Sequence, residues 1–284
     1  MRYARFERRD GVLELAEARA HPLPADLFQP GPLGGPARDP EALAGALAAL
    51  LEGEQPEEAS LLLPDRWLRL AFAEITELPR GDEGRAEAFR FKLRQLVPFR
   101  VDELRVEGFE VAPLAGQGEP RRVVLAFCVE SLVRQLEHAF AARGVALGLV
   151  TGESLALHSL LDEPGLSVVL RESDDAYTLL VGAGSEPLLF RYKPLAGRDG
   201  TAVVRELRLT RSFLDERVPG RQIGRALVAA PDPAPWLECL REGLGVEAEP
   251  FSAAAIVGTT LRLDAGWSWS EGGPLLGVAL QEVA

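Results

Sequence analysis

The chain has 284 residues, of which 47% are hydrophobic and 26% are charged, so it is long and apolar enough to build its own core. Its formal net charge of −12 argues against a protein that binds the phosphate backbone of nucleic acid, because such proteins carry a basic surface. Cys128 and Cys239 stand in separate apolar segments, which favours buried free thiols over a disulfide framework or a zinc site.

Neither a membrane span nor a secretion signal is visible in the sequence. No apolar run approaches the roughly 18 to 20 residues that a membrane-spanning helix needs. The N-terminal MRYARFERRDG lacks the apolar centre of a signal peptide. We therefore expect a soluble, cytoplasmic protein.

The first half of the chain alternates strand and helix patterns. Asp10-Gly11, a common hairpin signal, separates strand patterns at 2–8 and 12–20. After a loop rich in proline and glycine, a helix begins at Pro40, with Asp39 able to cap it. The elements expected next are strands at 60–64 and 67–75, a helix at 83–97, strands at 103–111 and 121–129, a helix at 130–144, a strand at 145–150 and a helix at 153–161.

After Pro164-Gly165 the pattern restarts with three strands in succession. The expected elements are strands at 166–172, 176–183 and 187–195, a helix at 201–217, a strand at 225–231, a helix at 236–245, a strand at 246–251 and a helix at 252–263. The last twenty or so residues show no pattern that can be assigned.

Both halves thus repeat paired strands, then helix, strand and helix. This repeat predicts an α/β (α+β) protein of two related lobes. The first lobe is expected at 1–165, with an inserted subdomain at about 60–120 that has its own strands around one helix. The second is expected at 166–284, with a C-terminal helix that can return to the first lobe.

The order and texture of these segments resemble the actin-like ATPase fold and, within it, the PilM family of type IV pilus assembly proteins. The resemblance rests on five stretches: HPLPADL, DPEALAGALAALL, SLLLPDRWLRLAFAEITELP, EAFRFKLRQLVPFRVDELRVEGFEV and VVLAFCVESLVRQLEHAFAARGVALGLVTGESLALHSLL. It implies a two-lobed actin-like (ribonuclease H-like) fold with an inserted subdomain. The cytoplasmic part of the type II secretion protein GspL is a close cousin with the same architecture.

In actin-like ATPases two strand-turn-strand hairpins with an Asp-x-Gly pattern grip the phosphates and the metal. Glycine is needed there because a side chain would block the close approach of the backbone. The second hairpin should be VVLRESDDAYTLLV, at 168–181, where Arg171 or Glu172 stands in place of the aspartate. The first would need an Asp-x-Gly strand ahead of YARFER, which the chain does not supply.

The third nucleotide turn of the family is a pair of glycines after a strand of the second lobe. Here Ala229 and Ala230 stand in their place. With all three turns missing or altered, we expect no nucleotide, no cofactor and no catalysis. The alternative is an active ATPase whose first phosphate loop lies in a segment absent from this chain.

The sequence was also searched for metal-binding and catalytic residues outside the nucleotide turns. Asp174 and Asp175 could hold a cation, but no neighbouring segment offers further oxygen ligands, so a hydrated turn is favoured. His21, His138 and His158 fall into no catalytic or metal-binding pattern, and we expect structural or solvated roles for them. No serine-hydrolase, P-loop or dinucleotide-binding motif is present.

The PilM resemblance implies a partner. It would be a PilN-like protein with a single span in the inner membrane, whose cytoplasmic N-terminal segment lies in a groove between the opening lobe and the inserted subdomain. Transferred to this sequence, the groove walls are Leu62, Pro64, Arg66, Pro98 and Phe99. The chain would then be a non-catalytic scaffold at the cytoplasmic face of the inner membrane, peripheral to it through partners. The alternative is the cytoplasmic domain of a GspL-like protein.

One basic stretch stands out in this acidic chain. FRFKLRQLVPFR carries Arg90, Lys92, Arg94 and Arg100. It fits either the solvated face of a helix or a patch for an acidic partner or anionic lipid headgroups.

Overall fold

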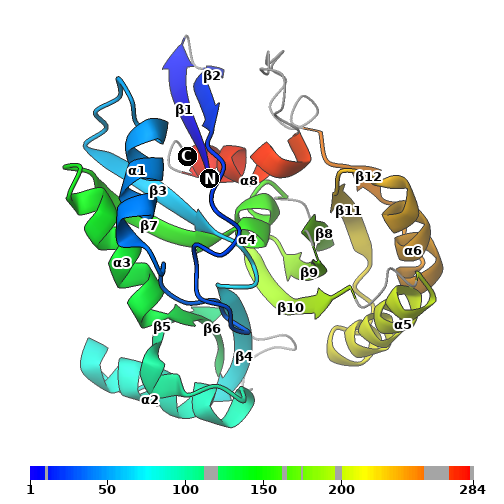
Figure 1. Cartoon of the computed structure of the whole chain (residues 1–284). Coiled ribbons are helices and arrows are strands. Elements are labelled where there is room, and N and C mark those ends of the chain that lie inside the picture. The colour runs from blue at the N-terminus through cyan, green and yellow to red at the C-terminus, as the bar shows by residue number, and fades with distance from the viewer. Residues whose placement is uncertain are drawn as a thin grey trace.

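The structure is a computed structural model that describes residues 1–9, 12–111, 121–161, 165–173, 175–195, 200–252 and 269–281. Figure 1 shows two lobes side by side, with the chain passing from the blue and green lobe to the yellow and orange one. Among the described residues, no helix is long and apolar enough to cross a membrane.

The first lobe opens with the predicted hairpin. Its strands pair antiparallel from Arg2↔Ala20 to Arg9↔Val12. The helix that follows begins where predicted, because the Asp39 carboxylate accepts hydrogen bonds of 3.0 Å from the backbone N–H groups of Glu41 and Ala42. The elements of this lobe are β1 (Arg2–Arg9), β2 (Val12–Ala20), α1 (Pro40–Leu50), β3 (Glu58–Leu63), α3 (Glu130–Ala141), β7 (Ala146–Gly152) and α4 (Glu153–His158).

The inserted subdomain is a three-stranded antiparallel sheet with one helix on it. The strand order is β4-β6-β5, and Phe89 and Leu93 of the helix pack into its core. The central strand β6 lies wholly beyond residue 120. Strand β3, at Glu58–Leu63, pairs in parallel with β7 of the first lobe and is not part of this sheet. The elements are β4 (Arg69–Ile75), α2 (Asp82–Leu96), a short 3₁₀ turn (Val101–Glu103), β5 (Leu104–Val111) and β6 (Arg121–Val129).

The second lobe is built on a five-stranded sheet of order β10-β9-β8-β11-β12. One face is covered by α5 and α6, through residues such as Leu207 and Leu240. The other face packs on α4 and α8, through Leu157 and Leu276. The elements are β8 (Leu166–Ser173), β9 (Ala176–Ala183), β10 (Glu186–Pro194), α5 (Gly200–Arg217), β11 (Ile223–Ala229), α6 (Ala234–Leu244), β12 (Glu249–Pro250) and α8 (Trp269–Gln281).

The C-terminal helix α8 arises from the stretch to which no pattern could be assigned. It contacts α4 and β3 of the first lobe and β11 of the second, and Figure 1 shows it in red between the lobes. The helix predicted at 252–263 falls, apart from Ser252, outside the described residues.

Candidate functional site between the lobes

The stretch VVLRESDDAYTLLV forms the predicted hairpin. β8 and β9 pair antiparallel from Leu166↔Ala183 to Ser173↔Ala176. The hydroxyl of Ser173 donates to the carbonyl of Ala176 at 3.2 Å, which closes the ladder at the turn. Of the two aspartates in the turn, Asp174 lies outside the described residues.

Arg171 reaches from this hairpin to the first lobe. Its guanidinium Nη1 lies 2.9 Å from Oε2 of Glu153 and 4.0 Å from Oδ2 of Asp65. The side chains of Arg171 and Asp65 are only 11% and 3% exposed, so this ion pair is largely shielded from water. A cation of the second lobe therefore joins two carboxylates of the first.

Asp65 is held in place by the first turn of α4. Its carboxylate accepts a hydrogen bond of 3.0 Å from the backbone N–H of Ser154 and another from the Ser154 hydroxyl. Glu172, the neighbour of Arg171, accepts a bond of 2.8 Å from the indole N–H of Trp236. The charged groups at the end of β8 are therefore paired with protein groups, where the resemblance would place phosphate or metal contacts.

The two alanines that stand in place of the family's glycine pair lie in the core. Ala229 is 1% exposed and packs in a cluster with Leu13 and Leu157, and Ala230 is 6% exposed and packs with the core of the second lobe. Their methyl groups thus fill space inside the protein rather than leave an open backbone surface for an adenosine.

The first nucleotide hairpin has no counterpart among the described residues. In the second lobe, β8 and β9 together form the hairpin. In the first lobe, β1 pairs with β2 and β3 pairs with β7 in two separate sheets, and no described strand joins β1 to β3.

A cavity of about 820 Å³ lies where the inserted subdomain meets the second lobe. Pro98 and Phe99 of the predicted groove line it together with Arg69, Leu70, Val97, Phe127, Phe190, Arg191, Tyr192, Lys193, Glu206 and Leu209. Leu62, Pro64 and Arg66 are not among the lining residues: Leu62 is opposite Thr151 in the β3–β7 pair, and Arg66 lies over the ring of Trp67. Whether these five residues bind a partner stays a prediction.

Arg69 lines this cavity and was not among the residues that the sequence pointed to. Its guanidinium carbon lies 4.5 Å from the ring centre of Tyr192 and 5.9 Å from that of Phe99, which ties the subdomain to β10. It also donates to the carbonyl of Pro32 at 2.7 Å, and burial lowers its pKa. Lys193 lies 2.9 Å from Glu206 and lowers the pKa of that carboxyl. The cavity wall is therefore aromatic and basic.

The basic stretch of α2 is partly neutralised. Arg94 pairs with Asp102 at 2.8 Å and Arg100 with Glu103 at 2.7 Å, all with exposed side chains. These pairs favour the solvated-face interpretation of the stretch.

His158 and Cys128 are buried titratable side chains. Nε2 of His158 lies 2.9 Å from the Ser167 hydroxyl, and burial lowers the pKa of His158 to about 4, so the ring is neutral and holds α4 against β8. Burial raises the pKa of the Cys128 thiol to about 11. Within the described part of the chain, no group of three or more His, Cys, Asp and Glu side chains could hold a metal ion.

Comparisons with protein families and with curated protein sequences gave no match. Solved structures do match. The "PilM-PilN type IV pilus biogenesis complex" aligns with a TM-score of 0.73 at 18% identity, over 100% of this chain and 95% of that one. The chain has the PilM fold. The expected PilM resemblance and two-lobed actin-like architecture are thereby confirmed.

Two further structures align at lower scores. The cytoplasmic domain of EpsL, an inner-membrane component of the type II secretion system of Vibrio cholerae, has a TM-score of 0.45 at 15% identity over 95% of this chain and 88% of that one. A Bacteroides thetaiotaomicron protein of unknown function with an actin-like ATPase fold has a TM-score of 0.46 at 9% identity, over 82% and 80% of the two chains.

Within this fold, the β8–β9 hairpin and the cavity beside Phe99 are two separate sites. The β8–β9 hairpin keeps its strands, but Arg171 and Glu172, one of which stands where the resemblance places an aspartate, are both paired with protein groups. The aromatic and basic cavity lies beside the inserted subdomain, and none of the three residues of the Arg171 ion pair lines it.

Proposed function

We propose that this protein is a non-catalytic, actin-like scaffold of the inner-membrane assembly complex of a type IV pilus. The observation that carries the proposal is the match of the whole chain to a structure of a PilM–PilN type IV pilus biogenesis complex. The partner is a PilN-like protein with a single membrane span, and the scaffold lies at the cytoplasmic face of the inner membrane. The boundary between its lobes lies near Gly165, between α4 and β8.

The ion pair of Arg171 supports a scaffold without nucleotide. A bound Mg·nucleotide needs carboxylates free to face the metal and N–H donors free to face the phosphates. Here Asp65 and Glu153 are neutralised by a guanidinium of the opposite lobe, and a phosphate placed beside them would have to displace it. The arrangement fixes one lobe to the other without a ligand.

The cavity beside Phe99 supports a peptide partner. Its volume of about 820 Å³ is within the range of about 300 to 1,000 Å³ that is usual for ligand-binding pockets. Aromatic walls with a few cations supply both apolar contact and orientation for an extended segment. Of the five predicted groove residues Leu62, Pro64, Arg66, Pro98 and Phe99, the last two line this cavity.

The test is binding of a synthetic peptide that copies the cytoplasmic N-terminal segment of the PilN-like partner, followed by fluorescence anisotropy. Phe99→Ala should weaken binding at least about tenfold, since removing a central aromatic contact costs about 2 kcal/mol. Phe109→Ala is the matched control, because Phe109 is 44% exposed on β5 and lines no part of the cavity. Equal binding by both variants and the parent would reject this groove.

A further inference from the structure

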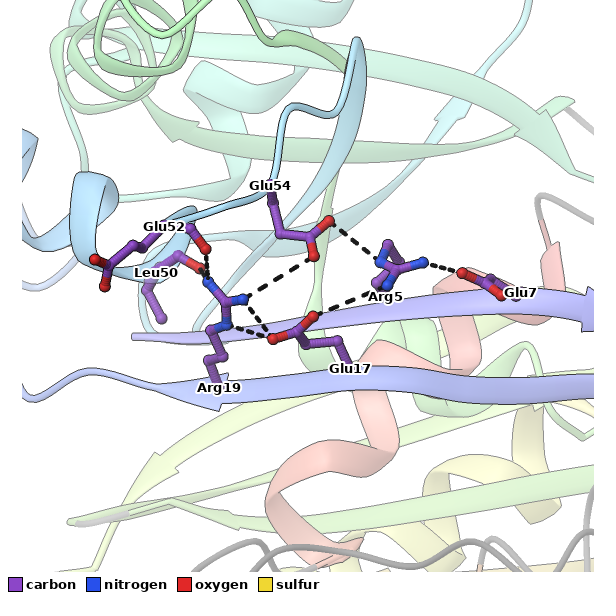
Figure 2. A network of polar contacts seen from close by, with 7 residues as sticks. All are labelled: Arg5, Glu7, Glu17, Arg19, Leu50, Glu52 and Glu54. Atoms are coloured by element: carbon purple, nitrogen blue, oxygen red, sulfur yellow. Dashed lines mark hydrogen bonds and ion pairs between the residues drawn. The ribbon is translucent and has the colours of Figure 1, made fainter.

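Half-buried arginines in the first lobe face carboxylates. Figure 2 shows Arg5 and Arg19 reaching from the β1–β2 hairpin toward the acidic side chains of one network. Nε of Arg5 lies 3.2 Å from Oε2 of Glu54. Nε of Arg19 donates to Oε1 of Glu17 at 2.7 Å. Such pairs offset part of the free energy that is lost when a guanidinium leaves water.

The inserted subdomain pairs Arg105 in the same way. The side chain of Arg105 is 29% exposed, and its Nε lies 2.7 Å from the carboxylate of Glu130. It also pairs with Glu137. The hydrogen bonds to Glu137 and Glu130 raise the pKa of Arg105, although burial acts in the opposite direction. A cation that this subdomain shields from water is thus neutralised by acids of the same chain.

Arg69, at the start of β4, has a different environment. Aromatic rings hold its guanidinium carbon, at 4.5 Å from the ring centre of Tyr192 and 5.9 Å from that of Phe99. One hydrogen bond of 2.7 Å goes to the carbonyl of Pro32, and its buried Nε donates to no described group. No carboxylate of the described residues pairs with it. A guanidinium has five N–H donors, so Arg69 has donors left for an anion.

The cavity that Arg69 lines has an excess of positive charge. Arg191 and Lys193 of β10 line it as well, and Glu206 is the one carboxylate among its described lining residues. That carboxylate is taken by Lys193 at 2.9 Å, while Arg191 donates to the hydroxyl of Thr210 at 3.0 Å. In a chain with a net charge of −12, this local excess of cations favours an acidic occupant.

The remainder of the cavity wall is apolar. Phe99, Phe127, Phe190 and Leu209 line it, and Leu209 is 55% exposed. An acidic side chain in such surroundings makes a stronger hydrogen bond to a guanidinium than it would in water, because the local dielectric constant is lower. The neighbouring wall offers contact to apolar side chains and no further cation pairs. The chemistry therefore fits one acid between apolar neighbours and not a run of acids.

We propose that this cavity selects a partner segment with one aspartate or glutamate between apolar residues, and that Arg69 binds its carboxylate. This assignment rests on the proposed function, because it concerns the same cavity and the same peptide. The carboxylate belongs to a side chain and not to a chain terminus, because the proposed partner presents its N-terminal segment. Arg69 comes from the inserted subdomain and Tyr192 from the second lobe, so the acid is bound where the two meet.

The test begins with changes in the peptide alone. The probe is the synthetic peptide that copies the cytoplasmic N-terminal segment of the PilN-like partner, and binding is followed by fluorescence anisotropy. In further peptides each aspartate or glutamate is replaced in turn by asparagine or glutamine. One replacement should weaken binding to the parent protein about tenfold or more, because hydrogen bonds between charged groups are among the stronger ones. This measurement does not depend on the folding of any variant.

The second step removes the guanidinium. Arg69→Gln should bind the acidic peptide and its amide version equally, because the two changes remove the same interaction. A purely structural role of Arg69 would weaken both peptides and leave their ratio unchanged. Arg94→Gln is the matched control, because Arg94 is 56% exposed, pairs with Asp102 and lines no part of the cavity. It should keep the preference of the parent. The same preference in Arg69→Gln would reject Arg69 as the binding residue.

The outcomes separate this assignment from the proposed function. If Phe99→Ala weakens binding but the parent binds the acidic and amide peptides equally, acid recognition is wrong and the peptide groove is right. A partner segment without any acidic residue has the same meaning. If the parent binds none of the peptides, both proposals are wrong. Sedimentation that shows a dimer of the parent, dissociated by Arg69→Gln, would overturn the assignment by making a second copy of this chain the occupant.

Discussion

Replacing Arg171 by methionine tests whether an ion pair joins the lobes. The substitution Arg171→Met keeps an unbranched apolar stem but removes the guanidinium that faces Glu153 and Asp65. Breaking a buried ion pair by removing one partner costs about 3 to 5 kcal/mol, because the remaining charge stays desolvated. Asp65 is 3% exposed and Glu153 is 20% exposed, so we expect the lower end of this range, about 3 kcal/mol.

The assay is equilibrium unfolding of the parent and the variant. For a chain of this size, a loss of about 3 kcal/mol lowers the thermal midpoint by about 6 to 12 °C. Arg208→Met is the matched control, because Arg208 pairs with Glu242 on the surface, where the side chains are 61% and 55% exposed. It should cost less than about 1 kcal/mol. Adding Asp65→Asn to Arg171→Met should cost less than the sum of the two single changes. Equal midpoints for Arg171→Met and Arg208→Met would refute the reasoning.

Two further predictions concern buried titratable groups. Burial lowers the pKa of His158 from 6.5 to about 4, so the unfolded chain binds the proton more readily than the folded one. The free energy of unfolding should therefore fall by about 3 kcal/mol as the pH drops from above 6.5 toward 4. In urea titrations a His158→Gln variant should lose this part of the pH dependence of stability, and an unchanged pH dependence would contradict the assignment. Burial raises the pKa of the Cys128 thiol to about 11 and also raises that of the Cys239 thiol. Neither thiol should therefore react with a thiol reagent at pH 8 until urea unfolds the chain. Rapid labelling of the native protein would contradict this prediction.

Local signals in the sequence predicted most elements correctly. Asp10-Gly11 between two alternating patterns marked the first hairpin, and Asp39-Pro40 marked the start of α1. Both signals act within a few residues of the chain, so they can be identified without knowledge of the fold.

Helix α8 could not be predicted because its sequence opposes helix formation. Pro274 lies inside it, and glycines flank that proline. Two of these glycines are explained by packing. A Cβ at Gly277 would lie 1.9 Å from the carbonyl oxygen of Ala156, and one at Gly273 would lie 2.5 Å from the ring of Phe251. The helix therefore forms through close tertiary contact, which overrides its low intrinsic propensity.

The sequence identified only some of the residues of the candidate site, because the others come together only through the tertiary fold. The position of Arg171 was recognised, but its partners Asp65 and Glu153 lie in the other lobe and no spacing pattern connects them. In the same way, Phe99 was named as a groove residue, whereas Arg69 and Tyr192 meet only when the subdomain packs on β10. Contacts between distant segments depend on the fold and not on local pattern.

Thermal unfolding with and without Mg·ATP tests the central claim, a scaffold without nucleotide, most directly. A ligand at about 100 times its dissociation constant adds about 2.7 kcal/mol to stability. For a chain of this size that corresponds to a rise in midpoint of about 5 to 11 °C. The scaffold account predicts the same midpoint with and without millimolar Mg·ATP. A clear rise would contradict it and would assign this protein to the nucleotide-binding members of the actin-like fold.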